Sequence, residues 1–133
     1  SLGEALMVCK KYGLDLTTAY HGIRISSGNS FVHETESKVI LNGSYDVGFT
    51  MDLVCKDVGL FNKLTEKLNI PAELSPIIVK IFNEGKMKYG DRSLSTSIVK
   101  LLEDKCNVNL RAGGFPSQLQ DKDSRKKGIE LIS

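Results

Sequence analysis

Two adjacent charged residues, Lys56 and Asp57, interrupt an otherwise amphipathic run from Phe49 to Leu68. Read at 3.6 residues per turn, this run predicts a helix with one apolar stripe. The stripe consists of Leu53, Val54, Val58, Leu60, Phe61, Leu64 and Leu68. Asp57 falls in the middle of the stripe and Lys56 at its edge. Because a carboxylate that faces a core is costly unless it is paired, we expect Asp57 to have a defined partner and Lys56 to hold its ammonium where it can be aimed at a ligand.

A purely structural interpretation of the same pair is the alternative. Asp57 could fasten a neighbouring loop or helix start, and Lys56 could extend its stem to solvent. Buried carboxylates are more often structural than chemical, so the residues alone favour the structural interpretation for both. Gly59 costs about 1 kcal/mol relative to alanine in a helix interior, which predicts the close approach of another backbone or a ligand at this position.

The remaining pattern is that of a helical chain. Apolar spacing predicts six helices: from Leu2 to a stop at Gly13, from an N-cap at Asp15 to about 26–28, from Phe31 to about Lys38, over 49–68, from Ser75 to about 85–90, and from Ser93 through Leu102. Only Val39–Leu41 could form a short strand. Three start signals are visible: a capping box of Ser1 and Glu4, an N-cap at Asp15, and Ser75 followed by Pro76. We therefore predict an all-α fold with a single domain of about five to six helices over 1–106, and a tail over 107–133 that is partly docked or mobile.

Composition narrows the function. The 133 residues carry 18 basic and 16 acidic side chains, so the net charge of +2 favours neither nucleic acid nor a membrane surface as a partner. The one dense basic cluster, at Lys122 and 125–127, is interpreted as a solvated tail. No apolar run approaches the roughly 20 residues that span a bilayer. The odd, widely spaced cysteines Cys9, Cys55 and Cys106 predict neither a disulfide framework nor a metal site, and favour a reducing, cytoplasmic location.

Most catalytic motifs are missing. The chain contains no glycine fingerprint for a dinucleotide, no phosphate loop and no nucleophile elbow. His21 and His33 have no spaced second ligand, and Glu34 and Glu36 form no evident acid and base pair. The turn at 26–30 could touch an anion through its backbone amides, although an ordinary helix-to-helix turn is favoured. We therefore predict no catalytic residue in this chain.

An ordered set of short motifs resembles the C-terminal domain of the β-hydroxyacid dehydrogenase family. This family comprises the 3-hydroxyisobutyrate dehydrogenases and tartronate semialdehyde reductases, relatives of 6-phosphogluconate dehydrogenase. The matching segments are Glu4-Ala5-Leu6, Lys11 to Asp15, Ser27 to Ser30, Phe49, Lys56 to Leu60, and Ile70-Pro71. The lysine-aspartate motif is the most specific of them. Phe61, where the family usually has a small residue, departs from the pattern, as does the tail beyond Asn107.

The resemblance implies a helical domain that follows a Rossmann domain and packs against it across the cofactor cleft. It implies that Lys56 reaches NAD or NADP near the nicotinamide, with Asp57, Gly59 and Phe49 as structural support. The family reaction is reversible hydride transfer between the cofactor and a small hydroxy acid. The family's catalytic lysine and its dinucleotide fingerprint precede the segment that matches Glu4-Ala5-Leu6, so the chain is expected to be inactive alone.

Two functional hypotheses remain from the sequence. The first is the oxidoreductase domain, whose partners are its own Rossmann domain, a small hydroxy acid and a second copy in a homodimer. The second is a non-catalytic helical module for interaction or dimerisation. Large apolar residues at Phe31, Phe82, Phe115 and the terminal isoleucines could supply the dimer contact.

Overall fold

The computed structural model describes residues 1–119, and every regular element in this part of the chain is a helix. The elements are α1 (Leu2–Lys11), α2 (Leu16–Arg24), α3 (Phe31–Asn42), α4 (Met51–Lys67), α5 (Leu74–Tyr89), the 3-10 helix η1 (Ser95–Val99) and α6 (Lys100–Cys106). The predicted all-α class with five to six helices is confirmed. Within 1–119, strand-like pairing is limited to one bridge between Thr50 and Leu94, and none of the helices there is long and apolar enough to cross a bilayer.

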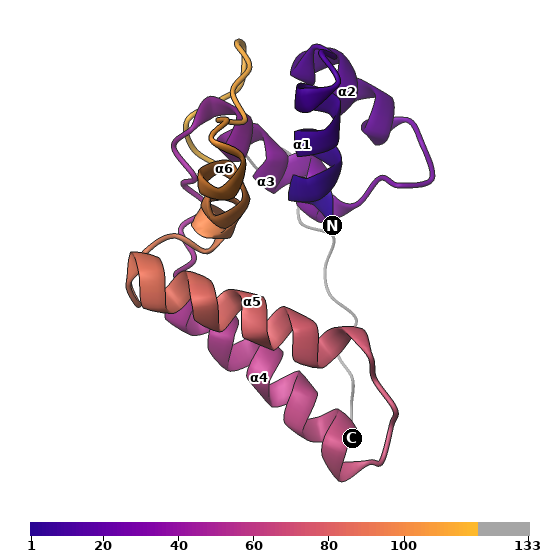
Figure 1. Cartoon of the computed structure of the whole chain (residues 1–133), viewed down its shortest axis with the longest axis vertical. Helices are drawn as coiled ribbons and strands as arrows, with labels where there is room; N and C mark the ends of the chain where they lie inside the picture. The colour runs from indigo at the N-terminus through magenta and orange to yellow at the C-terminus, as the bar shows by residue number, and fades with distance from the viewer. Residues whose placement is uncertain (120–133) are drawn as a thin grey trace, which may run out of the picture.

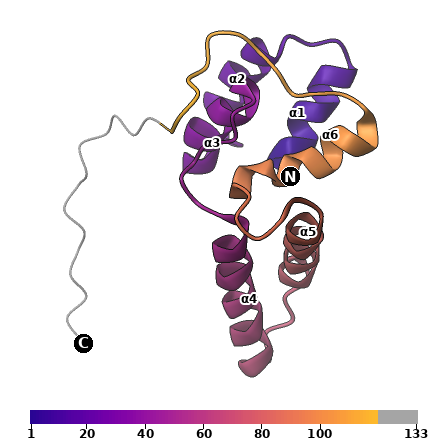
Figure 2. The ribbon, with the colours of Figure 1, turned by 90° about the vertical axis from the view of Figure 1, so that its left-hand side faces the viewer.

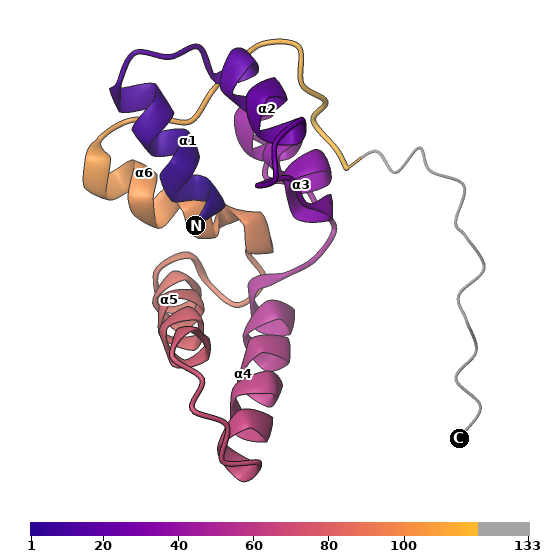
Figure 3. The same cartoon turned by 90° about the vertical axis from the view of Figure 1, so that its right-hand side faces the viewer.

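The helices form two parts that we call the body and the hairpin. The body consists of α1, α2, α3, η1, α6 and residues 107–119, and the hairpin consists of α4 and α5. Figure 1 shows α4 and α5 lying side by side as an extended pair below the body, and Figure 3 shows that the pair projects away from it. The two parts therefore offer very different amounts of shelter to their apolar side chains.

The core lies in the body. Leu6, Leu41 and Leu110 are fully buried, and Leu16 is nearly so. Tyr20 packs beside them, with its ring in edge contact with the ring of Phe115 at a centroid distance of 5.0 Å. This cluster joins α1, α2, α3 and the segment after α6, so residues 108–115 pack on the same core as the first helix.

Helix boundaries in the body follow capping chemistry. Asp15 Oδ2 accepts a hydrogen bond from the Thr18 amide at 2.7 Å, as predicted, and Ser30 Oγ accepts one from the His33 amide at 3.0 Å. α3 ends at Gly43, whose φ of 93° is left-handed. The strand considered at Val39–Leu41 was wrong, because these residues form the last turn of α3. All three are buried, and a helix enclosed on all sides gives a continuous apolar run that resembles a strand.

Two predicted starts also need correction. Ser1 occupies the N-cap of α1, but its side chain makes no capping hydrogen bond, so the capping box with Glu4 is not formed. α5 begins at Leu74 after Glu73, and Ser75 and Pro76 lie inside its first turn. Proline is tolerated there because the first amides of a helix have no intrahelical partner. The last predicted helix begins with the 3-10 turn of η1 and becomes α-helical only at Lys100.

The hairpin joins the body through two short backbone segments, one before α4 and one after α5, which are hydrogen-bonded to each other. The Met51 amide donates to the Ser93 carbonyl at 2.7 Å, and the Ser95 amide donates to the Phe49 carbonyl at 2.8 Å. Close packing at this junction occurs at Gly85, where an added Cβ would overlap the Ile98 side chain. Among the helical glycines, a close approach of this kind is found at Gly85 and was not predicted there.

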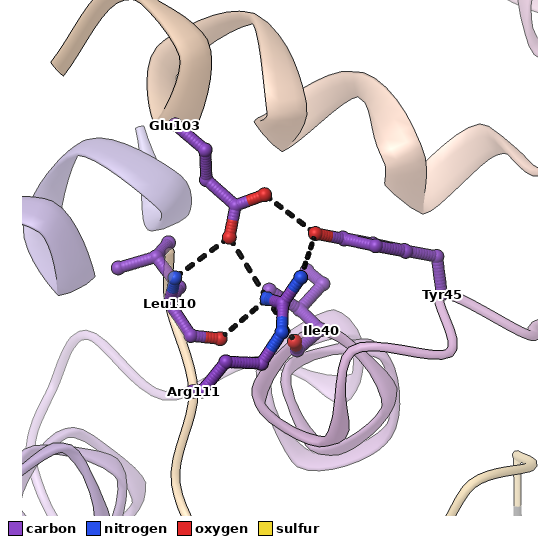
Figure 4. A network of polar contacts seen from close by, with 5 residues as sticks. All are labelled: Ile40, Tyr45, Glu103, Leu110 and Arg111. Atoms are coloured by element: carbon purple, nitrogen blue, oxygen red, sulfur yellow. Dashed lines mark hydrogen bonds and ion pairs between the residues drawn. The ribbon is translucent and has the colours of Figure 1, made fainter. Parts of the chain in front are cut away.

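Residues 107–119 return across the body and are fastened by a polar network (Figure 4). The Glu103 carboxylate, 3% exposed, accepts from Tyr45 Oη at 2.5 Å, from the Leu110 amide at 2.7 Å and from Arg111 Nη1 at 2.9 Å. Arg111 Nη2 donates to Tyr45 Oη at 2.6 Å. Burial, which is the larger cause, and the hydrogen bond to Glu103 together raise the pKa of Tyr45 to about 12. Since each group has a partner, the network fixes the returning segment without leaving a buried charge unpaired.

Candidate functional site

Lys56 and Asp57 lie near the middle of α4 and point into solvent. Their side chains are 60% and 56% exposed, and Lys56 Nζ lies 3.1 Å from Asp57 Oδ1. The expectation that Asp57 faces the core was therefore wrong, and its partner is Lys56 at the surface. An exposed ion pair of this kind contributes at most about 1 kcal/mol, so its geometry is not a strong structural constraint. The Lys56 ammonium has three donors and remains accessible to a further anionic or polar group.

The apolar stripe around Asp57 exists, but nothing within residues 1–119 covers most of it. Leu60, Phe61, Leu64 and Leu68 are each more than half exposed. The buried residues of α4, Met51 and Thr65, lie at one edge of the stripe, beside the half-buried Val54 and Val58, and Met51 lies close to Gly85 of α5. A helical wheel identifies an apolar face but not what packs against it, so it could not show that only one edge of the stripe is covered. Contiguous exposed apolar side chains of this size mark an interaction surface.

The proposed supporting residues have different surroundings. No atom within 4 Å would meet a Cβ added at Gly59, so residues 1–119 contain no close approach there. Phe49 immediately precedes α4, is 36% exposed and holds the hairpin to η1 through its carbonyl. The structure thus brings Phe49 to the base of the hairpin and leaves the Lys56 turn free of other side chains of the body.

A groove of about 550 Å³ separates the hairpin from the body. Its walls are mainly apolar, and Figure 2 shows the N-terminal end of α1 facing the hairpin where the groove lies. Polar groups on its walls include Glu36 from α3, Glu84 from α5 and Lys105 from α6. Lys105 Nζ is paired with Glu84 Oε1 at 3.1 Å. Burial raises the pKa of Glu36, whose carboxylate has no hydrogen-bond or ion-pair partner within residues 1–119.

From the sequence, Glu36 was considered only together with Glu34, with which it forms no evident acid and base pair. The network of Tyr45, Glu103 and Arg111 was not anticipated. A glutamate in an apolar stretch such as Leu101-Leu102-Glu103 is the one local signal that could have indicated it. The tertiary return of residues 107–119 supplies its partners.

Other polar candidates are satisfied within the domain. In the turn at 26–30, Asn29 Nδ2 donates to Glu34 Oε1 at 2.7 Å, and Ser30 caps α3. His33 is fully buried and bonds the Tyr20 carbonyl and the Ser37 hydroxyl, so it is a packing histidine. The described residues hold no group of three His, Cys, Asp or Glu side chains that could bind a metal, and the three cysteines are free.

Comparison with known proteins places this helical domain in a family. Residues 1–102 match the family model described as NAD-binding of NADP-dependent 3-hydroxyisobutyrate dehydrogenase. The chain is 32% identical over 114 residues to 2-(hydroxymethyl)glutarate dehydrogenase of Eubacterium barkeri, covering 85% of this chain and 38% of that protein. It is 26% identical over 98 residues to L-threonate dehydrogenase of Haemophilus influenzae, covering 74% of this chain and 33% of that protein. The chain thus spans about a third of the length of these relatives.

Solved structures agree with the fold. A 3-hydroxyisobutyrate dehydrogenase from Salmonella typhimurium superposes with a TM-score of 0.66 at 23% identity, covering 74% of this chain and 35% of that chain. The Mycobacterium tuberculosis 3-hydroxyisobutyrate dehydrogenase superposes with a TM-score of 0.67 at 21% identity, covering 75% of this chain and 36% of that chain. Together with the family match over residues 1–102, the six helices identify this chain as the C-terminal helical domain of a member of the NAD(P)-dependent β-hydroxyacid dehydrogenase family.

Proposed function

We propose that the parent protein is an NAD(P)-dependent dehydrogenase of a small hydroxy acid, or a reductase of the matching semialdehyde, and that this chain forms one wall of its cofactor cleft. The observation that carries the proposal is the accessible Lys56 ammonium, presented by a helix whose neighbouring apolar residues are uncovered, in a chain of this family. Exposed leucines beside an accessible cation suit the edge of an interdomain cleft better than a free surface.

Lys56 is the proposed cofactor-binding residue. Asp57 neutralises one side of the ammonium at 3.1 Å, which leaves the remaining N–H groups to donate to polar atoms near the nicotinamide. The bound cofactor would accept or donate the hydride. In this scheme Asp57 orients the Lys56 head group, Phe49 fixes the base of the hairpin, and Gly59 admits the facing surface one turn further along α4. No residue of this chain is assigned the proton transfer.

The partners follow from the same arrangement. A Rossmann domain preceding this chain in the parent protein would cover the Lys56 side of α4 and supply the catalytic groups, so these 133 residues alone are expected to be inactive. We also propose a homodimer. Of the predicted contact residues, Phe31 is 68% exposed, Phe82 lines the groove and Phe115 packs on Tyr20, while the terminal isoleucines lie outside the described residues. Phe31 is therefore the best described candidate. A cytoplasmic location agrees with the three free cysteines.

A Lys56→Ala variant of the parent protein tests the proposal. Loss of a charge-assisted hydrogen bond worth about 1.5–3 kcal/mol should raise the Kd for NADH or NADPH by roughly 10- to 100-fold. Lys63→Ala, which removes another exposed lysine from α4, is the matched control and should leave the Kd within about twofold. Turnover is assayed with 3-hydroxyisobutyrate, 2-(hydroxymethyl)glutarate and L-threonate, because the matched relatives are named for these hydroxy acids.

The second candidate function is a helical interaction module in which the lysine-aspartate pair no longer binds a cofactor. The uncovered stripe of α4 is the observation that favours it. A parent protein that binds neither cofactor, or whose cofactor affinity is the same in the Lys56→Ala and Lys63→Ala variants, would support the module and overturn the proposed role of Lys56.

A further inference from the structure

Tyr45 lies in the loop that leads from α3 into α4, in a backbone conformation that tyrosine rarely adopts. Its φ is 57°, in the left-handed region that bulky side chains disfavour. A residue keeps such a conformation only where its surroundings hold it there. Tyr45 is also only 8% exposed, although it belongs to a loop. The contacts of Tyr45 therefore decide the path of the chain between α3 and the hairpin.

The side chain of Tyr45 is held by α6 and by the segment that follows α6. Figure 4 shows its hydroxyl between the Glu103 carboxylate and the Arg111 guanidinium, to which it is joined at 2.5 and 2.6 Å. The Arg111 guanidinium carbon lies 5.1 Å from the centre of the Tyr45 ring, and the Lys100 ammonium lies 6.0 Å from it. Both cations are close enough to be attracted by the ring. The hydroxyl and the ring are thus both fixed.

The backbone around Tyr45 is fastened to the body as well. Thr96 Oγ1 of η1 donates to the Tyr45 carbonyl at 2.6 Å. The Leu119 amide donates to the Asp46 carbonyl at 3.1 Å. The loop reaches Phe49 three positions after Asp46, immediately before the N-cap of α4. Since so few residues intervene, the positions of Tyr45 and Asp46 set the place at which α4 leaves the body.

The partners of the Tyr45 hydroxyl lie beyond the residues that the family model matches. The match ends at residue 102, and both Glu103 and Arg111 follow it. Leu119, which holds the next residue of the loop, follows it too. The match over residues 1–102 therefore does not account for the way in which this chain fixes the loop.

Lys56 depends on the base of α4 for its position. Among residues 1–119 its ion-pair partner is Asp57, which is on the same helix and does not tie α4 to the body. At 1.5 Å per residue, Lys56 lies about 7.5 Å along the helix axis from Met51, where α4 begins. Tilting α4 by about 10° at its base would move the Lys56 backbone by about 1.3 Å. A displacement of this size at a reacting or binding group is costly for an enzyme.

We propose that Tyr45, held by Glu103 and Arg111, is a positioning residue for Lys56: it fixes the loop before α4 and thereby the place at which the ammonium meets the cofactor. This inference rests on the proposed function, because it deepens the role given there to Lys56. Tyr45 is buried, and its hydroxyl is occupied by two partners within this chain. It acts through Lys56 and not by contact with the cofactor.

A double-mutant cycle in the parent protein tests the proposal. Tyr45→Phe keeps the ring and removes the hydroxyl, and should raise the Kd for NADH or NADPH by about 3- to 10-fold. In a Lys56→Ala background the same substitution should change the Kd by less than about 1.5-fold, because no ammonium remains to be misplaced. Equal fold-changes in the two backgrounds, or no change in either, would overturn the proposal.

A destabilised variant with an intact loop is the control. Leu16→Val shortens a buried side chain of α2, which is 2% exposed and lies in the core of the body. It should lower the melting temperature yet leave the Kd within about twofold, because it does not touch the loop. A rise in Kd as large as that of Tyr45→Phe would mean that cofactor binding follows overall stability, and would contradict a positioning role.

Hydrogen exchange of the 133-residue chain tests the loop without a cofactor. The Met51 amide, which is bonded to the Ser93 carbonyl at the junction, should exchange at least about threefold faster in Tyr45→Phe than in Leu16→Val. Equal exchange in the two variants would overturn the proposal. A parent protein that binds cofactor through Lys56 but does not respond to Tyr45→Phe would refute only this inference. Faster Met51 exchange together with a parent that binds neither cofactor would refute the proposed function and leave Tyr45 as the residue that positions α4.

Discussion

The body and the hairpin are built from similar residues, but the body buries most of its large apolar side chains near the core and the hairpin exposes many of its own. In the body, Leu41 and Leu110 are fully buried and Glu103 has three hydrogen-bond donors around its carboxylate. In the hairpin, Leu60 and Phe61 are about 60% exposed and the Lys56–Asp57 pair faces water. The body buries a hydrophobic core within residues 1–119, whereas the hairpin presents apolar and charged groups together. The difference indicates that the hairpin, more than the body, carries an uncovered interaction surface.

Truncating one leucine in each part should give the largest contrast. Leu41→Ala creates a cavity in the closed core and should lower the free energy of unfolding by about 2–5 kcal/mol. Leu60→Ala, at an uncovered position of α4, should change it by less than about 0.5 kcal/mol. Urea denaturation of the 133-residue chain measures both. Similar costs at the two sites would mean that the hairpin is already covered in the isolated chain, and the comparison would fail.

Removing the acceptor of the body's polar network should have the next largest effect. Glu103→Ala leaves Tyr45, the Leu110 amide and Arg111 without their shared partner, so we expect a loss of about 3 kcal/mol in the free energy of unfolding. Glu84→Ala is the control. It breaks an ion pair to Lys105 that is about half exposed, and should cost at most about 1 kcal/mol. Equal losses would show that the network contributes no more than a surface pair.

Substitution of two helical glycines compares the closed junction, at Gly85, with the open surface, at Gly59. Gly85→Ala forces a methyl group against Ile98 and should destabilise the chain by about 1–3 kcal/mol. Gly59→Ala meets no atom within 4 Å and should stabilise it by up to about 1 kcal/mol through helix propensity. Thermal denaturation tests both. If Gly59→Ala destabilises only the parent protein, another surface approaches α4 there. Destabilisation in the isolated chain would contradict the open surface.

The smallest expected effect concerns the groove carboxylate and pH. Burial raises the pKa of Glu36 above its unfolded value, so the folded chain binds more protons between the two pKa values and stability falls as pH rises through that window. Glu36→Gln should therefore stabilise the 133-residue chain at pH 7 but not near pH 4. Denaturation at both pH values measures the difference. Glu66→Gln on α4 is the control, and a pH-independent effect at Glu36 would contradict this account.

Most local signals were read correctly, although the capping box at Ser1 and the N-cap at Ser75 were not. The Asp15 cap, the helix predicted over 49–68 and the ordered motifs of the family are all properties of short segments. Capping and periodicity depend on residues within one or two turns, so they are visible without a three-dimensional structure. The family assignment follows from the same segments in sequence order, over residues 1–102.

Tertiary structure alone decided which faces are covered. On the apolar side of α4, only packing shows that Met51 is buried near Gly85 of α5 while most of the stripe around Asp57 is open. The partners of Glu103 lie 58 residues away at Tyr45 and 8 away at Arg111, and they meet because residues 107–119 fold back. The amino-acid sequence by itself thus determined the helices and the family. Burial, the polar network and the groove depended on long-range contacts, because the free energy of a side chain depends on what surrounds it and not on its position along one helix.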